Sequence, residues 1–426
     1  MPTRSQTNIP PVTEVSLRSG GAVVILALAL LARLFTVYFA ISEHGAKWLY
    51  TRGLEMGFVA RSLDTGRGFA NPFGMDTGPT AMIAPGYPIM VAGIFRVFGI
   101  ETSASAVVIM LLHVAASVLT VWFIMKFAGH CFGMRAAMIA GFFWAVWLPL
   151  LWVPTIFWET SFSACMMLAL LMFAVRLREQ PSRILWVLFG LYCGLASLIN
   201  MAMLLSSLAV FLWLAFYHWR IWRTSLITAL LLFALVYSPW PLRNARTFHA
   251  FIPLRTTVGF ELWVGNQDNA TGYLDESLFP IYDRQQLALY MREGELGYDK
   301  EKSAEGRMWI AAHPAQFAKL TTLRFLRFWR GTGIKNGASV YGLGATLTTI
   351  FGMLGLAFLY RSGRRGLTIL FAIPFLLFPL PYYITHAEFR YRIVLDPILT
   401  VLAGGALARF TAKGREQADK LIEARA

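Results

Sequence analysis

The sequence predicts an all-α polytopic membrane protein with about ten transmembrane helices and two long extracytoplasmic segments. Three observations lead to this prediction. Hydrophobic residues make up 57% of the 426 residues and charged residues only 14%, whereas a soluble globular chain has about 25% charged residues. Apolar runs of about 20 residues, long enough to cross a bilayer, recur along the whole chain. Short basic clusters separate many of these runs, as they do in the inward-facing loops of membrane proteins.

The first apolar run, 21–41, contains Arg33 and is followed by no small-residue cleavage site, so we interpret it as a retained span and not a signal peptide. Arg33 is expected either to pair with a carboxylate or lipid phosphate, or to snorkel to the interface. Short runs around Pro149 and Asn200 predict tilted or broken helices. The further candidate spans are 104–127, 136–153, 157–175, 184–200, 202–218, 224–240, 338–360, 366–385 and 392–409.

The basic residues indicate the orientation of the chain. If the N-terminus is inside, every short inside loop contains Lys or Arg, as in the pair Lys126 and Arg135. An even number of spans then places both termini in the cytoplasm. The predicted organisation is a cytoplasmic tail (1–20), helices 1–7 with an outer loop at 42–103 (21–240), an outer segment (241–337), helices 8–10 (338–409) and a cytoplasmic tail (410–426).

The composition also argues against several functions. The net charge of +15 lies in clusters between apolar runs, which favours membrane orientation over nucleic-acid binding. The three cysteines lie in or beside apolar segments, so we predict no disulfide framework. Three of the histidines, which lie in predicted outer regions, are too far apart in sequence to show ligand spacing. We therefore predict no metal site and no cofactor, and leave metal dependence open. The three cysteines are Cys131, Cys165 and Cys193, and the three histidines are His44, His313 and His386.

The outer segments contain several local signals. Leu54, Phe58 and Leu63 predict a short amphipathic helix with Glu55 near its start. Pro85–Pro88 predicts a turn, followed by a short re-entrant or interfacial helix at 89–98.

The second outer segment predicts one strand at 260–264, and helices at 283–293 and 301–312. A further helix is expected to begin at Pro314. Its three arginines at three-residue spacing, with aromatic residues between them, predict a basic face at headgroup level, formed by Arg324, Arg327 and Arg330.

The last outer turn, HAEFRYR at 386–392, is rich in charged and aromatic residues between two apolar spans. It could be a polar cap on a helix hairpin. Two arginines on the outer side run against the positive-inside bias, which favours a functional site. Sugar transfer needs a carboxylate near the attacking hydroxyl or the sugar carbon, and cations for the leaving phosphate. Glu55, Arg390 and Arg392 supply these groups on one face of the membrane.

Four stretches together resemble the GT-C class of membrane glycosyltransferases, and in particular proteins similar to protein O-mannosyltransferases and lipid A aminoarabinose transferases. They are LEMGFVARSL after the first span, APGYP before an apolar helix, PWPLRN at the start of the outer segment, and HAEFRYR…DP at the last span. The resemblance implies sugar transfer from a polyprenyl-phosphate donor to an extracytoplasmic protein, lipid or glycan, in a bacterial inner membrane. Membrane lipids are the other expected partners. The LTRP stretch usual in the family is replaced here by 197–200 (SLIN), so substrate choice is expected to differ.

The resemblance also implies roles for individual residues. Glu55 holds the place of the acidic residue that acts as a base or as a clamp on the acceptor. The donor phosphate is expected at Arg390, Arg392 and Arg243. Substrate-binding residues are expected at Tyr87, Glu159, Asn266, His386 and Glu388. Helix N-terminal stabilisation is the simpler role for Glu159, and ion pairing with the arginines is an alternative role for Glu388.

Two other functional classes fit the same composition. A transporter or lipid flippase would also have about ten spans and intramembrane charges, but it normally shows internal repeats, and we find none. A non-catalytic envelope scaffold would give no function to Glu55 or to the pair Arg390 and Arg392.

Overall fold

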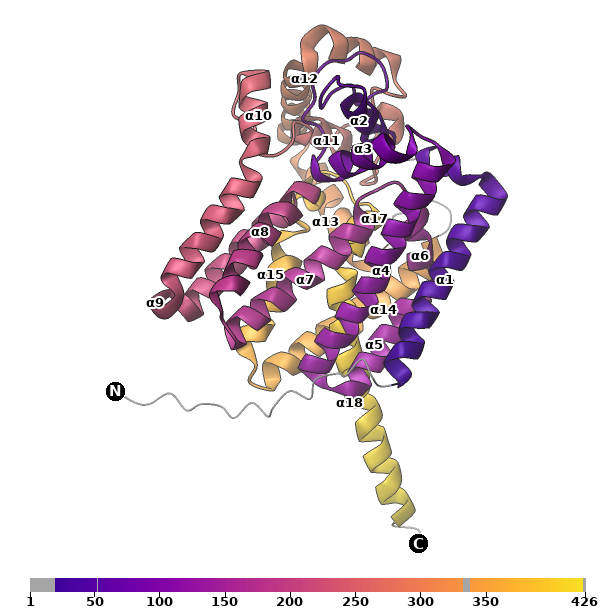
Figure 1. Cartoon of the computed structure of the whole chain (residues 1–426), viewed down its shortest axis with the longest axis vertical. Helices are drawn as coiled ribbons and strands as arrows, with labels where there is room; N and C mark the ends of the chain where they lie inside the picture. Colours follow the sequence, from indigo (N-terminus) through magenta and orange to yellow (C-terminus); the bar gives the residue numbers. More distant parts are fainter. Residues whose placement is uncertain (1–19, 52, 332–337, 424–426) are drawn as a thin grey trace.

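The computed structural model describes residues 20–51, 53–331 and 338–423. Within these ranges the chain forms helices and no strand, apart from two isolated β-bridges. Figure 1 shows a helix bundle whose upper end is covered by α2, α3, α11 and α12. The predicted all-α polytopic membrane fold is therefore confirmed. The predicted N-terminal tail lies outside the described residues, apart from its last residue.

The bundle consists of long apolar helices and a few short ones that join them. The long helices are α1 (Gly20–His44), α4 (Ser103–Phe132), α5 (Met134–Val146), α7 (Thr160–Glu179), α8 (Arg183–Ile199), α9 (Met203–Tyr237), α14 (Ala338–Arg361), α15 (Arg365–Leu377) and α18 (Asp396–Glu423). The short ones are α6 (Leu148–Trp152), the 3₁₀ turn η2 (Val153–Thr155), α16 (Leu380–Ile384) and α17 (Phe389–Ile393). The predicted C-terminal tail, 410–426, is helical as far as Glu423, because α18 continues into it.

The covering layer comes from the two predicted outer segments. Its elements are η1 (Ala46–Thr51), α2 (Leu54–Asp64), α3 (Gly86–Phe98), α10 (Pro239–Phe248), α11 (Val258–Gly265), η3 (Glu276–Leu278), α12 (Arg284–Ala312) and α13 (Pro314–Arg330). The amphipathic helix after the first span and the helix beginning at Pro314 are confirmed. The strand expected at 260–264 is wrong, because these residues belong to α11. The two helices expected at 283–293 and 301–312 form one element, α12, interrupted at Gly294 with φ 69°.

The predicted count of ten spans is not confirmed. Among the described residues, six helical segments are long and apolar enough to cross a membrane, or seven if the bent pair of α5 and α6 is one span. α8 has only 17 residues. The two spans expected at 202–218 and 224–240 both fall within the single element α9.

The element α9 folds back on itself at Trp222, whose backbone is not helical (φ −111°, ψ 17°). The ring centroids of Phe211 and Phe233 are 5.9 Å apart, although 22 residues of straight helix would separate them by about 33 Å. Both arms pack on α8. The second arm approaches it so closely that a side chain at Gly190 would overlap the backbone of Ala229. The two arms correspond to the two predicted spans.

The span formed by α5 and α6 is broken, with a bend of 59°. Pro149 lies in the first turn of α6 and cannot donate a backbone hydrogen bond to α5. The carbonyls left open at the end of α5 belong to Trp144 and Ala145, and each accepts a hydrogen bond from the buried Arg33 at 3.1 Å. Arg33 also donates to Ser117 Oγ at 2.6 Å. It binds backbone carbonyls and a hydroxyl, so pairing with a carboxylate and snorkelling are both wrong for this residue.

The last helix, α18, passes through the centre of the bundle (Figure 1). A side chain at Gly404 would lie 2.8 Å from the carbonyl oxygen of Ala136, and one at Gly405 would overlap the ring of Phe132. Without side chains at these two positions, α18 approaches α4 and α5 closely, as small residues allow between membrane helices.

The two outer segments are fastened to each other by hydrogen bonds. The buried carboxylate of Glu295, on α12, accepts from the amide of Ala81 at 2.6 Å, the hydroxyl of Thr256 at 2.5 Å and the hydroxyl of Tyr290 at 2.8 Å. The loop that holds Ala81 therefore lies against α12, although about 210 residues of chain separate them. These contacts make the covering layer one packed unit.

Both outer segments lie at the same end of the bundle, and α1 begins and α18 ends at the other (Figure 1). This arrangement supports the proposal that the covered end is extracytoplasmic. Because the three native cysteines are buried, introduced cysteines can be labelled over a low background. We expect Thr65→Cys and Lys300→Cys to react with a membrane-impermeant maleimide in intact cells, and Ser362→Cys to react only after permeabilisation. The reverse pattern would contradict the assigned orientation.

Candidate active site

A cavity of about 310 Å³ lies beneath the covering layer. Its walls come from α2, the start of α3, the start of α7, the start of α9, α11 and the turn from α16 to α17. Polar and charged side chains from distant parts of the sequence meet in it. The ones that matter for the chemistry are Glu55, Tyr87, Glu159, Arg255, His386 and Arg390.

Glu55 lies in the first turn of α2, where the helix dipole favours a negative charge. Its carboxylate forms no ion pair with any described residue. Burial raises its pKa, and the positive charge of Arg390 partly opposes this effect. The result is a carboxylate that holds its proton more strongly than an ordinary glutamate, as expected for a general base.

Arg390 lies on α17 and also lines the cavity. Its guanidinium forms an ion pair with Glu388 and lies 4.3 Å from the ring centroid of Trp158. Its Nη2 donates to the hydroxyl of Tyr391 at 3.4 Å, whereas its Nη1 has no partner among the described residues. Stacking on Trp158 and pairing with Glu388 fix the plane of the guanidinium while one edge stays available.

His386 is buried in the wall of the cavity, and its Nε2 lies 2.9 Å from the hydroxyl of Tyr391. Burial lowers the pKa of His386, so the ring is neutral near pH 7. Because arginine can only donate, the Tyr391 oxygen accepts from Arg390. Tyr391 also stacks on Tyr382, with centroids 4.0 Å apart.

Tyr87 and Glu159, two residues that the resemblance predicts to bind substrate, both line the cavity. The hydroxyl of Tyr87 lies 2.9 Å from His113 Nε2. One carboxylate oxygen of Glu159 is buried without a partner among the described residues. Glu388 serves as the ion partner of Arg390 and does not itself line the cavity.

Besides Glu388, three predicted site residues do not line the cavity. Asn266 is buried and binds backbone, with Nδ2 donating to the carbonyls of Leu262 and Ile384. Arg243 donates to the carbonyls of Phe69 and Thr80 at 2.6 Å each, so it fastens the first outer loop to α10. The third residue is Arg392.

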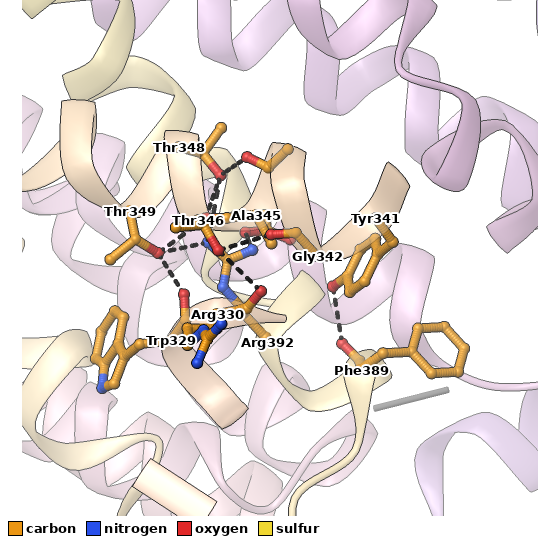
Figure 2. Close-up of polar contacts among 12 residues, drawn as sticks. Trp329, Arg330, Tyr341, Gly342, Ala345, Thr346, Thr348, Thr349, Phe389 and Arg392 are labelled. Atoms are coloured by element: carbon orange, nitrogen blue, oxygen red, sulfur yellow. Dashed lines mark hydrogen bonds and ion pairs between the residues drawn. The ribbon is translucent and has the colours of Figure 1, made fainter. Parts of the chain in front are cut away.

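Arg392 is fully buried between α14 and α18 and forms an ion pair with Asp396. Figure 2 shows it among Ala345, Thr348 and Thr349 of α14. The backbone at 390–392 is helical and not extended. These residues form α17, in which positions two apart point about 200° away from each other. Only one arginine of the pair can therefore face the cavity, and that residue is Arg390.

The structure also adds residues that the sequence did not single out. Arg255 lines the cavity and pairs with Glu261, which lies on α11, at 3.2 Å. Trp158 and Tyr382 form aromatic parts of the wall. No spacing in the sequence marks Arg255 or Glu261, because their contact depends on how the loop before α11 turns.

Arg324 occupies a different place from the one predicted. It is fully buried and not part of a headgroup-level face. Its guanidinium donates to the carbonyl of Gly265 and, at 3.2 Å, to that of Ile384. It thereby joins the end of α11 to the end of α16, on either side of the cavity wall.

Gly265 lies where these two helix ends meet, and a side chain there would overlap the carbonyl of Thr385. We expect Gly265→Ala to destabilise the protein by about 1–3 kcal/mol through overpacking. Gly93→Ala is the matched control, because a side chain at this helical position meets nothing within 4 Å. Thermal unfolding in detergent would measure both, and equal melting temperatures would contradict the close contact.

Among the described residues, no group of three His, Cys, Asp or Glu side chains is arranged to hold a metal ion. The charged groups of the cavity instead form carboxylate–arginine pairs, with Glu55 and Glu159 left over. The arrangement suits a reaction in which a carboxylate takes a proton and an arginine holds an anion.

Known proteins resemble this chain in part of its sequence and in its fold. The model of the dolichyl-phosphate-mannose-protein mannosyltransferase family matches residues 83–241. Among solved structures, the chain is similar to the oligosaccharyltransferase AglB from Archaeoglobus fulgidus in complex with an inhibitory peptide and a dolichol-phosphate. The TM-score is 0.56 at 13% identity, over 96% of this chain and 52% of that one. The chain has the fold of a GT-C class glycosyltransferase.

A second structure of that oligosaccharyltransferase, in complex with Zn and sulfate, gives the same GT-C fold, with a TM-score of 0.55 at 14% identity over 95% of this chain and 51% of that one. The chain thus spans about half the length of these proteins. ArnT from Cupriavidus metallidurans bound to undecaprenyl phosphate also matches, at 14% identity over 92% of this chain and 78% of that one. Its TM-score of 0.38 is too low to establish a shared fold. No curated protein matches the sequence significantly.

Proposed function

We propose that this protein transfers a sugar from a polyprenyl-phosphate carrier to a hydroxyl of an acceptor on the extracytoplasmic side of the membrane. One observation carries the proposal: Glu55 and Arg390, which are 335 positions apart, line the same cavity. A proton acceptor and an anion holder are the two groups that this reaction needs. The GT-C fold and the mannosyltransferase family match support the same reaction class.

In the proposed reaction, the acceptor hydroxyl attacks the anomeric carbon of the sugar, and Glu55 takes the hydroxyl proton. The bond between that carbon and the phosphate oxygen breaks as the bond to the acceptor oxygen forms. The leaving group is the polyprenyl phosphate, which gains the negative charge. Carboxylate-assisted sugar transfer of this kind passes through an oxocarbenium-like transition state.

Arg390 is the group best placed to hold that phosphate. Its Nη1 is free among the described residues, and its Nε and Nη2 are already engaged, so the guanidinium is oriented before the donor arrives. Arg255 is a second cation in the cavity wall. Fixed donors that need no reorganisation stabilise developing charge more effectively than mobile ones.

The apolar side of the cavity fits a lipid-linked donor. Leu205, Leu254, Val258 and Ile384 line the cavity and have exposed side chains, Val258 by 59%. A prenyl chain lying on these residues would place its phosphate at headgroup depth, next to the charged groups. The membrane itself would be the inner membrane of a bacterium.

A transfer assay tests this function. Purified protein in detergent is incubated with a short-chain polyprenyl-phosphate sugar and a mixture of acceptor classes, and release of polyprenyl phosphate is measured. Donor consumption that depends on the acceptor supports the proposal. Movement of the lipid donor across a vesicle bilayer without release of polyprenyl phosphate would instead indicate a flippase, the alternative that the sequence left open.

A further inference from the structure

The turn between α16 and α18 brings His386, Arg390 and Tyr391 to the cavity, but it has little stability of its own. α17 has five residues, which is far fewer than an isolated helix needs to form in water. The direction in which Arg390 points therefore depends on the contacts that hold α17 in place.

Two contacts fasten this turn to α14 (Figure 2). At its start, the hydroxyl of Tyr341 donates to the carbonyl of Phe389 at 3.2 Å. At its end, Arg392 donates to the carbonyl of Ala345 at 2.7 Å and to Thr349 Oγ1 at 2.8 Å. The ion pair with Asp396 adds a link to the first turn of α18.

Because α17 is helical, the contacts of Arg392 also determine the direction in which Arg390 points. Two residues along a helix correspond to a rotation of about 200°. With Arg392 held between α14 and α18, Arg390 must point to the opposite side of α17, where the cavity lies. We propose that Arg392 and Asp396 form an anchor that positions Arg390 for the donor phosphate, and that Arg392 itself touches no substrate. This inference rests on the proposed function.

Stability alone does not account for the anchor. A buried ion pair can often be replaced by apolar residues of similar size with no loss of stability. Apolar residues cannot fix the rotation of α17 in the same way, because each hydrogen bond from Arg392 holds the guanidinium against a particular atom. The positioning role and a purely structural role therefore predict different results for an apolar replacement of both residues.

The test is the double variant Arg392→Met with Asp396→Leu in the full chain. Its melting temperature and its affinity for undecaprenyl phosphate and for undecaprenol are measured in the same detergent, with inorganic phosphate as a competitor. The ratio of the two lipid affinities reports phosphate recognition alone. We expect a melting temperature close to that of the parent and a fall of about tenfold or more in the ratio, the size of one lost charged hydrogen bond. Competition by inorganic phosphate in the parent would show that a free phosphate is recognised without the lipid.

Two threonines of α14 provide a matched pair of milder variants. Thr349 Oγ1 accepts from Arg392, whereas Thr346 Oγ1 donates to the carbonyls of Arg330 and Gly342 and does not contact Arg392. Threonine to valine removes the hydroxyl and leaves the shape. We expect Thr349→Val to lower the phosphate preference severalfold and Thr346→Val to leave it unchanged.

An unchanged preference in the stable double variant overturns the anchor. If the double variant does not fold, the threonine pair decides, and equal preferences in the two valine variants overturn the anchor. A parent protein that binds undecaprenyl phosphate no better than undecaprenol has a different meaning: it overturns the donor side of the proposed function, and the anchor falls with it.

Discussion

Glu55→Gln is expected to lower the rate of sugar transfer by about 10²–10⁴-fold, the usual contribution of a general base. Glutamine keeps the shape of the side chain but cannot take the proton of the acceptor hydroxyl. Binding of the donor should stay near that of the parent, because in the proposed reaction Arg390, and not Glu55, holds the phosphate. The measurement is the rate of acceptor-dependent release of polyprenyl phosphate at saturating donor.

Glu43→Gln is a suitable control, because Glu43 is exposed near the end of α1 and takes no part in the cavity. The pH dependence adds a second check. Burial raises the pKa of Glu55, and the base is active when deprotonated, so transfer should fall as the pH drops through a value higher than that of an ordinary glutamate. The glutamine variant should lack this fall. Near-normal turnover in Glu55→Gln would instead assign the role to Glu159.

Arg390→Ala is expected to weaken donor binding by about 1.5–3 kcal/mol, the value of a hydrogen bond to a charged group. This corresponds to roughly tenfold to hundredfold in affinity. Arg390→Lys should restore binding only in part, because an ammonium makes no bidentate contact and cannot stack on Trp158 as a planar guanidinium does. Binding of undecaprenyl phosphate to the purified variants would measure both effects.

Removal of Arg390 also leaves Glu388 without its partner, so part of the loss could come from an unpaired carboxylate. The variant Arg390→Ala with Glu388→Gln separates the two effects, because it lacks the arginine without leaving an unpaired carboxylate at position 388. Arg96→Ala, on the exposed side of α3, controls for the loss of one positive charge. Parent-like affinity in the Arg390 variants would move the phosphate site to Arg255.

Much of the fold follows from local sequence patterns. Apolar runs predict the long helices. The helical spacing of Leu54, Phe58 and Leu63 predicts α2, and Pro314 predicts the start of α13. The local signals failed where distant contacts decide the structure. Phe260, Leu262 and Val264 alternate like strand residues, but Phe260 and Val264 are buried within the outer layer, and the chain there forms α11.

The candidate site was predictable in its residue types and only partly in its geometry. Glu55 and the arginine-rich last turn stand out because charges beside apolar spans are rare. Which arginine faces the cavity could not be predicted, because the choice depends on whether 390–392 is extended or helical. The sequence indicates Arg324 and Arg243 as available cations. Both instead bind backbone carbonyls that lie near them only in the folded chain.

The fastening of Ala81 to Glu295 has a consequence for the synthesis of this protein. The cavity walls begin at Gly53 and end at Val394, so no ribosome-bound intermediate has a complete site until the chain as far as Val394 has entered the membrane. Until α12 emerges, the loop that holds Ala81 has no carboxylate to bind. Until the turn before α18 arrives, the cavity lacks Arg390. A chain released before this turn is made would therefore contain most of the helices but no complete site.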